Sequence, residues 1–176
     1  MTITLRIAGP QDAALIGSLH GMSWRSAYTN VLSAEYLAGP VMDERGAVWA
    51  KRFAANDPTL HVIIAEVDGQ ALGFAGIYGG RDPIYGTLLD NLHLLPQAKG
   101  KGLGKLLLCE AARWTLAHYP GQTLYLTVWE VNHSARGFYQ HMGGVEHEPE
   151  PHPRSDGGQA PALRVVFHDV AGLARL

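Results

Sequence analysis

The stretch that decides the fold is LHLLPQAKGKGLGK, residues 92–105. An apolar run typical of a strand comes first, and apolar residues at helical spacing follow Gly102. The glycines between them let successive backbone N–H groups converge, and the start of the helix adds partial positive charge. Three of the four lysines of the chain, Lys99, Lys101 and Lys105, lie in this turn. The pattern predicts a binding site for a phosphate or pyrophosphate.

Two common phosphate-binding motifs do not fit this turn. A P-loop requires Ser or Thr after the lysine, but Lys105 is followed by Leu106. The dinucleotide pattern G-x-G-x-x-G fails because, read from Gly100 or from Gly102, its third glycine falls on Lys105 or Leu107. The remaining alternatives are a different nucleotide site and an ordinary turn before a capped helix.

Composition predicts one folded domain over residues 1–176. The chain has 176 residues, 47% of them hydrophobic and 17% charged, with a net charge of -2. These values exclude intrinsic disorder and give no bulk attraction to nucleic acid or an anionic membrane. Cys109 is the single cysteine, no apolar run reaches the ~20 residues of a membrane span, and no signal-peptide pattern opens the chain. We therefore expect a cytoplasmic protein without disulfides.

The periodicity predicts a mixed α/β domain, because strand and helix patterns alternate along the chain. The turn signal Asp68-Gly69 joins two strands into a hairpin. Loops are expected at 79–83 and at 146–161, where Pro and Gly are frequent. The predicted strands are 2–7, 60–67, 71–78, 87–95, 123–128 and 162–168, and the predicted helices are 12–22, 43–55, 102–118 and 132–142, with a separate stretch at 23–30.

A second motif, NHSARGFYQHMGG, occupies residues 132–144. Together with the glycine-rich stretch, it indicates a resemblance to a known family. The chain resembles the GCN5-related N-acetyltransferases (GNAT), whose loop reads [Q/R]-x-x-G-x-[G/A] and whose later motif reads N-x-x-A-x-x-F-Y. Lys99 stands at the first loop position instead of Gln or Arg, which keeps the charge and loses the planar fork. Residues 23–32 and 163–167 resemble the opening and closing segments of small bacterial members, so the likeness covers nearly the whole chain.

The resemblance implies a fold, a function and a cosubstrate. The fold is a mostly antiparallel central sheet with a splayed parallel pair, flanked by helices. The function is transfer of an acetyl group from acetyl-CoA to a primary amine by direct attack on the thioester. The alternatives are a non-catalytic acyl-CoA-binding or sensor domain and an acyltransferase with another donor or acceptor. The implied cofactor-binding residues are Leu92, His93, Leu94, Lys99, Gly100, Lys101, Gly102, Leu103, Gly104, Lys105 and Asn132.

Tyr139 and Asp90 are the catalytic candidates that the resemblance implies. Tyr139 occupies the position of the acid that protonates the departing CoA thiolate, although it could instead be a core residue beside Phe138. Many members carry Glu where this chain has Leu88. Asp90, two residues along the strand, is the candidate base, Glu130 is the other carboxylate, and water is the third possibility.

The acceptor side is less defined by the sequence. Trp24, Tyr28, Tyr85, Glu35 and Glu130 are candidate substrate contacts, although aromatic residues at helical spacing often pack in a core. The nature of the amine stays open, and it could be a small molecule or a peptide.

Three further features complete the predictions. His147 and His152 lie among prolines without regular ligand spacing, so no metal site is expected. Cys109 lies within a predicted helix and is expected to be an inert, packed thiol. A homodimer is possible if residues 163–168 form an exposed edge strand.

Overall fold

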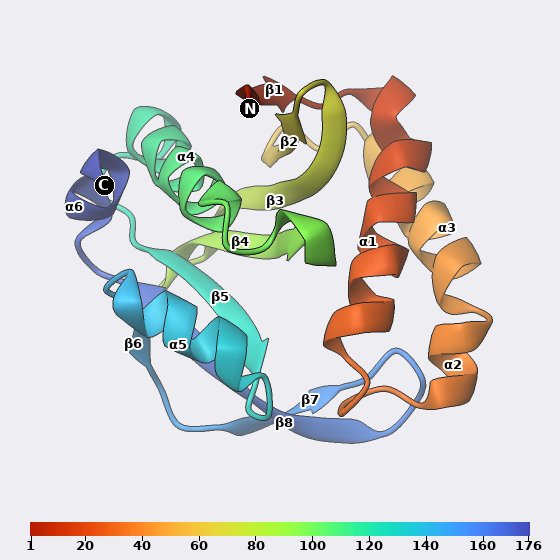
Figure 1. Cartoon of the computed structure of the whole chain (residues 1–176). Coiled ribbons are helices and arrows are strands. Elements are labelled where there is room, and N and C mark those ends of the chain that lie inside the picture. The colour runs from red at the N-terminus through yellow and green to blue at the C-terminus, as the bar shows by residue number, and fades with distance from the viewer.

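The central feature of the fold is one mixed sheet, shown in Figure 1 by a computed structural model that describes residues 1–176. Its strand order is β1-β2-β3-β4-β5-β8-β6, with β7 also paired to β8. Every pair is antiparallel except β4 with β5, as the predicted mixed α/β fold requires. The strands are β1 (Ile3–Ile7), β2 (Leu60–Val67), β3 (Gln70–Asp82), β4 (Gly86–Leu94), β5 (Leu124–Trp129), β6 (Val145–Glu146), β7 (Glu150–Pro153) and β8 (Gln159–Phe167).

Helices lie on both faces of the sheet. The paired helices α1 (Ala13–Ala27) and α3 (Val41–Ala54) cover one face, and α4 (Leu103–His118) packs on β3 and β4 from the other (Figure 1). The remaining helices are α2 (Ala34–Ala38), α5 (His133–His141) and α6 (Val170–Arg175). None of the helices is both long and apolar enough to cross a bilayer.

The parallel strands β4 and β5 separate along their length. Only two residue pairs join them, Thr87 with Leu124 and Leu88 with Tyr125. Asp90 lies in a β-bulge of β4, because its two neighbours pair with consecutive residues of β3 and leave it without a partner. A bulge bends a strand and increases its twist. The later halves of β4 and β5 therefore diverge, as the resemblance implies.

The expected loop at 79–83 is wrong, because β3 continues to Asp82. Gly79 occupies this strand for reasons of space, since a Cβ atom there would lie 1.9 Å from the ring of Tyr119. The connection to β4 is the short turn 83–85, where Asp82 Oδ1 accepts a hydrogen bond from the backbone N–H of Tyr85 (2.9 Å). Glycine in the sequence suggested a loop here, whereas in the structure it allows the strand to pack closely against Tyr119.

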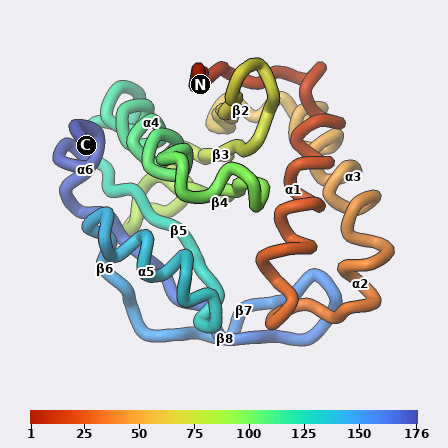
Figure 2. Tube along the Cα trace, viewed as in Figure 1, coloured from red at the N-terminus to blue at the C-terminus, as the bar shows by residue number.

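The expected loop at 146–161 is also wrong, because β7 and the start of β8 form a hairpin there. Pro151 pairs with Pro161 in this hairpin. Proline is tolerated on an edge strand, whose outer side needs no N–H donor. The hairpin reaches the start of α2 (Figure 2), where the backbone N–H of Ser33 donates to Asp156 Oδ2 at 2.7 Å.

The prediction that residues 163–168 form an exposed edge strand, at which two copies could pair, is also wrong. β8 has β5 on one side and β6 and β7 on the other, so its backbone groups are already paired within the chain. A second copy therefore cannot add to this strand.

Two short helices follow capping residues that periodicity does not reveal. Ser33 Oγ accepts from the backbone of Tyr36 at the start of α2, and Asp169 Oδ1 accepts from Gly172 at the start of α6. The separate stretch expected from residue 23 is instead the last part of α1, which continues to Ala27.

Candidate functional site

Two cavities meet where β4 and β5 diverge. The first, here called the splay cavity, encloses about 640 Å³ between β4, β5, α5 and the start of α4. The second, here called the side cavity, encloses about 440 Å³ between α1, α3, the middle of the sheet and the β7–β8 hairpin. Five residues line both cavities: Tyr28, Leu89, Asp90, His93 and Thr127. A molecule in one cavity can therefore meet a molecule in the other at this junction.

The backbone of β4 supplies hydrogen-bond donors to the splay cavity. The N–H of Leu95 donates to the carbonyl of Leu72 on β3 at 2.9 Å. Because backbone groups alternate sides along an extended strand, the N–H groups of Leu94 and Leu92 point away from β3, towards the gap left by β5. The splay thus leaves these two donors available.

The glycine-rich turn continues this row of donors. Gly100 and Gly102 have φ angles of 75° and 79°, in the left-handed region, and a Cβ atom on either would meet nothing within 4 Å. Their φ angles, and not crowding, therefore call for glycine. The N–H groups of residues 100–102 donate to no other backbone group, and no side chain caps the start of α4. Such an arrangement is a nest for anions.

Positive side chains surround this nest. Lys99 and Lys105 line the splay cavity, whereas Lys101 does not. None of the three has an acidic partner within 4 Å. Their charges are therefore available to an anion held by the turn.

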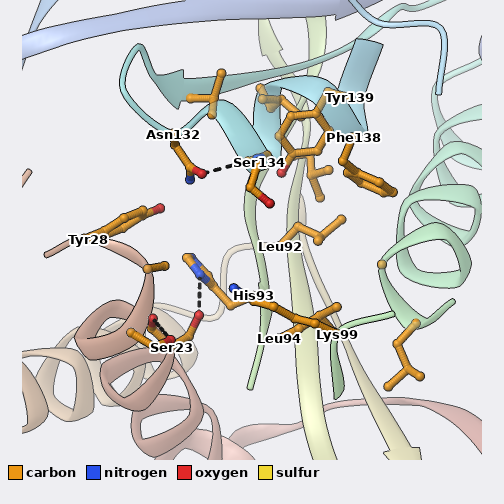
Figure 3. A pocket seen from close by; sticks show the side chains of 18 of the residues that line it. Ser23, Tyr28, Leu92, His93, Leu94, Lys99, Asn132, Ser134, Phe138 and Tyr139 are labelled. Atoms are coloured by element: carbon orange, nitrogen blue, oxygen red, sulfur yellow. Dashed lines mark hydrogen bonds between the residues drawn. The ribbon is translucent and has the colours of Figure 1, made fainter. Parts of the chain in front are cut away.

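Tyr139 presents its hydroxyl group to the splay cavity. The side chain is 7% exposed and packs beside Phe138, and its hydroxyl has no hydrogen-bond partner in the protein. Figure 3 shows the ring reaching towards Ser134 and Leu92. Burial, together with the nearby Tyr28, raises the pKa of Tyr139 above its usual range. The phenol therefore keeps its proton at neutral pH.

Asn132 joins the end of β5 to α5 and lines the splay cavity (Figure 3). Its Oδ1 accepts from the backbone N–H of Ala135 at 3.2 Å, so it caps the helix. Arg136 fixes this turn by a bidentate pair with Glu146 (2.8 Å each) and by donating to the carbonyl of Glu130 at 2.8 Å. The cap leaves the side-chain amide nitrogen free to face the cavity.

Two neutral histidines lie at the junction. His93 Nδ1 is 3.2 Å from Ser23 Oγ (Figure 3), and burial lowers the pKa of His93 to about 3. His20 is 1% exposed, stacks near His93 with ring centroids 4.6 Å apart, and accepts a hydrogen bond from the Trp49 indole at 2.9 Å. Burial also lowers the pKa of His20 well below its usual value. Neither imidazole carries charge at neutral pH.

Asp90 contributes the carboxylate of the junction. The bulge of β4 places it on both cavities, where its Oδ2 lies 2.8 Å from Nη1 of Arg52. The same guanidinium donates to Asn91 Oδ1 at 2.8 Å. Asp90 is thus held at the junction by an ion pair from α3.

A comparison of the whole chain with protein families decides its affiliation. Residues 24–144 match the model of the acetyltransferase (GNAT) family. The chain belongs to the GNAT family. It is 28% identical over 141 residues to the uncharacterised N-acetyltransferase YuaI of Bacillus subtilis, covering 78% of each chain. It is 29% identical over 118 residues to an aminoglycoside N(6')-acetyltransferase type 1 of Stenotrophomonas maltophilia, covering 64% of this chain and 67% of that protein.

Solved GNAT structures share the fold. The PaiA N-acetyltransferase of Thermoplasma acidophilum, solved in complex with coenzyme A, has a TM-score of 0.74 at 20% identity and covers 95% of this chain and 100% of that chain. YncA of Salmonella typhimurium, solved with acetyl-CoA, has a TM-score of 0.64 at 19% identity, covering 95% and 94%.

The remaining predicted residues of this GNAT chain fall into two groups. Trp24 lines the side cavity and Tyr28 lines both cavities. Tyr85, Glu130 and Glu35 line neither of them. All predicted cofactor-binding residues except Lys101 line the splay cavity.

Sequence reasoning missed most of the polar lining of the side cavity. His20 comes from α1, Arg45 and Arg52 from α3, and Arg164 from β8. A usable signal was present on α3, where Arg45 and Arg52 flank Trp49 at helical spacing and therefore share a face. Ser23 and Ser134, in the splay cavity, were also not named as site residues.

Cys109 and His147 line neither cavity, whereas His152, on β7, lines the side cavity. Cys109 is 1% exposed within α4, and burial raises the pKa of its thiol, as expected of a packed side chain. His147 packs against Tyr85, and His152 against Trp129. No three His, Cys, Asp or Glu side chains gather as a metal centre.

Proposed function

We propose that this GNAT acetyltransferase moves the acetyl group of acetyl-CoA to a primary amine by direct attack on the thioester. The observation that carries the proposal is the row of free backbone donors within one cavity, from Leu92 and Leu94 to residues 100–105. The side cavity opens onto the end of this row and supplies a separate approach for the amine.

The splay cavity fits acetyl-CoA by the chemistry of its lining. The nest at Gly100 and Gly102, with Lys99 and Lys105, would hold the pyrophosphate. Backbone groups of Leu92, His93 and Leu94 would line the acetyl group and the pantetheine arm, and the amide of Asn132 would hold the same arm from the opposite side. When bound, the thioester supplies an activated acetyl group.

Leu94 and Tyr139 act on the two ends of the breaking bond. The Leu94 N–H would donate to the thioester oxygen as negative charge develops there. The Tyr139 hydroxyl would give its proton to the sulfur as the C–S bond breaks and the C–N bond forms. Burial raises the pKa of a phenol and also that of a thiol, so the proton affinities of donor and acceptor rise together.

Asp90 is the proposed acceptor of the proton that the nitrogen loses after attack, directly or through water. The amine attacks in its neutral form, having first lost a proton to solvent, because a free carboxylate is too weak a base to deprotonate an ammonium ion, whose pKa is near ~10. Once the C–N bond has formed, the nitrogen is far more acidic and Asp90 can take the proton. His93 is a poorer candidate because burial lowers its pKa to about 3.

The test is an acetyl-transfer assay with a panel of amines that includes amino acids, polyamines, peptides and an aminoglycoside. Release of the CoA thiol is followed by colour, and mass spectrometry identifies the acetylated amine. We expect amine-dependent thiol release with one acetyl group added to nitrogen. Tight acetyl-CoA binding with no transfer to any amine would favour the sensor domain, and faster reaction with a longer acyl-CoA would favour another acyl donor.

A further inference from the structure

The side cavity is lined by hydrogen-bond donors that have no acceptor in the protein. Trp24 Nε1, Arg45 Nε and Arg164 Nε are buried without a partner. His20 accepts from Trp49 at Nδ1, so its hydrogen is on Nε2, which is also buried without a partner. Buried polar groups are nearly always paired. Two of these four residues are arginines, so the lining of the side cavity carries positive charge and N–H groups suited to a molecule with anionic acceptor atoms.

Two of these donors belong to guanidinium groups, one with a single long ion pair and one with none. Arg45 lies 4.3 Å above the Trp24 ring, and its nearest carboxylate, Glu44, is 3.9 Å away and already accepts from the Tyr36 hydroxyl at 2.6 Å. Arg164 lies 4.1 Å from the Tyr85 ring centroid and forms no ion pair. Stacking holds each guanidinium by its face and leaves the N–H edge for an anion.

The other charged residues of the side cavity do not form ion pairs with Arg45 or Arg164. Arg52 is paired with Asp90, so these two charges offset each other. Glu148 and Glu150 are exposed and form no ion pair with the arginines. Arg45 stacks on Trp24, the Trp24 ring centroid lies 4.9 Å from that of His20, and His20 lies 4.6 Å from His93, which places this guanidinium near the junction.

We propose that the acceptor is a small amine that also carries a carboxylate, as in an amino acid, with Arg45 binding the carboxylate while the amine faces the thioester site beside His93. Two further features fit this class. Trp129 and Tyr125 offer an apolar surface for the rest of the molecule, and Arg164 can take a second acceptor atom. The inference rests on the proposed acetyl transfer.

The test uses matched acceptors that differ only in the carboxylate. Each amino acid is compared with its decarboxylated amine: phenylalanine with phenethylamine, tryptophan with tryptamine, histidine with histamine, and lysine with cadaverine. We expect kcat/KM to be about 10- to 100-fold higher for the carboxylate-bearing member of the preferred pair, mostly through KM, as for a hydrogen bond to a charged group.

The α-amino group of an amino acid is less basic than the amine of its decarboxylated partner, which could by itself change the rate. Variants of Arg45 test whether the preference instead comes from the contact of Arg45 with the carboxylate. R45Q should remove most of the preference, with little change in acetyl-CoA affinity, and R45K should restore part of it. K51Q removes a charge from the exposed side of the same helix and should keep the full preference. The ratio between variants is independent of amine basicity, because each amine is compared with itself.

The outcomes distinguish this inference from the function on which it rests. Equal or faster turnover of the decarboxylated amines, or an unchanged preference in R45Q, overturns the inference while acetyl transfer stands. If no pair is acetylated although CoA binds, tryptophan fluorescence of the CoA-bound protein decides, since Trp24 lies in the cavity. Carboxylate-dependent binding supports the inference, and its absence overturns it. Failure to bind acetyl-CoA at all overturns the proposed function and the inference with it.

Discussion

The two cavities that meet at His93 differ in the kind of groups that they offer to a ligand. The splay cavity includes the open edge of β4, the glycine-rich turn and the first turn of α4, which offer backbone donors, together with residues from α1, β5 and α5. The side cavity is lined by side chains from α1, α3, β4, β5, β7 and β8. Backbone donors recognise any molecule with suitably placed phosphates and amides, whereas side chains can change without altering the fold. This difference suits a constant acetyl donor on one side and a particular acceptor on the other.

The largest expected effect concerns Tyr139, the proposed proton donor in the splay cavity. Replacing Tyr139 with Phe removes the proton donor, and we expect kcat to fall about 100-fold, as for the loss of a general acid. The Kd for acetyl-CoA, measured by calorimetry, should change little. Tyr119→Phe removes a hydroxyl outside both cavities and serves as the control. If the Tyr139→Phe variant kept the kcat of the unchanged protein, Tyr139 would not be the general acid.

The second prediction concerns the pH dependence of stability that the two buried histidines at the junction cause. Burial lowers the pKa of His20, and that of His93 to about 3, whereas an unfolded imidazole titrates near ~6.5. Below that pH the unfolded chain binds protons that the folded chain does not, so stability falls as pH falls, by roughly 1 kcal/mol per pH unit for each histidine. His61, which burial also affects, adds in the same direction.

Urea denaturation at about pH 7, 6 and 5 measures this slope. His20→Asn and His93→Asn should each flatten it, whereas His168→Asn, at an exposed position, is the matched control. A stability that does not vary between these pH values would show that the two imidazoles are not buried and neutral.

A smaller effect is expected from the lysines of the splay cavity. The double variant Lys99→Gln/Lys105→Gln should raise the Kd for acetyl-CoA about tenfold at low salt, because two charges near the phosphates are lost. The difference should shrink in high salt. Lys51→Gln is the control, since Lys51 is outside both cavities. An equal effect of both changes would indicate only long-range attraction.

The smallest effect tests the nest itself. Gly102→Ala and Gly121→Ala both place a Cβ on a left-handed residue with open space around it, at φ angles of 79° and 84°. Each should cost about 1–2 kcal/mol of unfolding free energy. Only Gly102→Ala should also weaken acetyl-CoA binding, because Gly121 lies beyond the end of α4. Equal affinity in both variants would contradict a nest at residues 100–105.

The same contrast explains what the sequence could predict. The nest depends on glycines and lysines that are adjacent in the chain, so Lys99–Lys105 could be recognised as one unit. Arg164 lies more than a hundred residues from Arg45, and nothing local indicates that they line one cavity. The β7–β8 hairpin was missed because Pro151 and Pro161 suggested a loop, although Pro151 lies on the edge strand β7 and Pro161 lies just beyond the last residue pair of β8 with β5.

The measurement that tests the central claim most directly is thermal unfolding of the protein with acetyl-CoA, CoA, ATP or NAD at matched concentrations. A ligand at about 100 times its Kd adds about 2.7 kcal/mol of apparent stability, which raises Tm by about 5–10 °C for a domain of this size. We expect this shift with acetyl-CoA and CoA, and a much smaller one with ATP or NAD. The absence of a shift with either CoA compound, or an equal shift with ATP, would contradict the assignment of the splay cavity to acetyl-CoA.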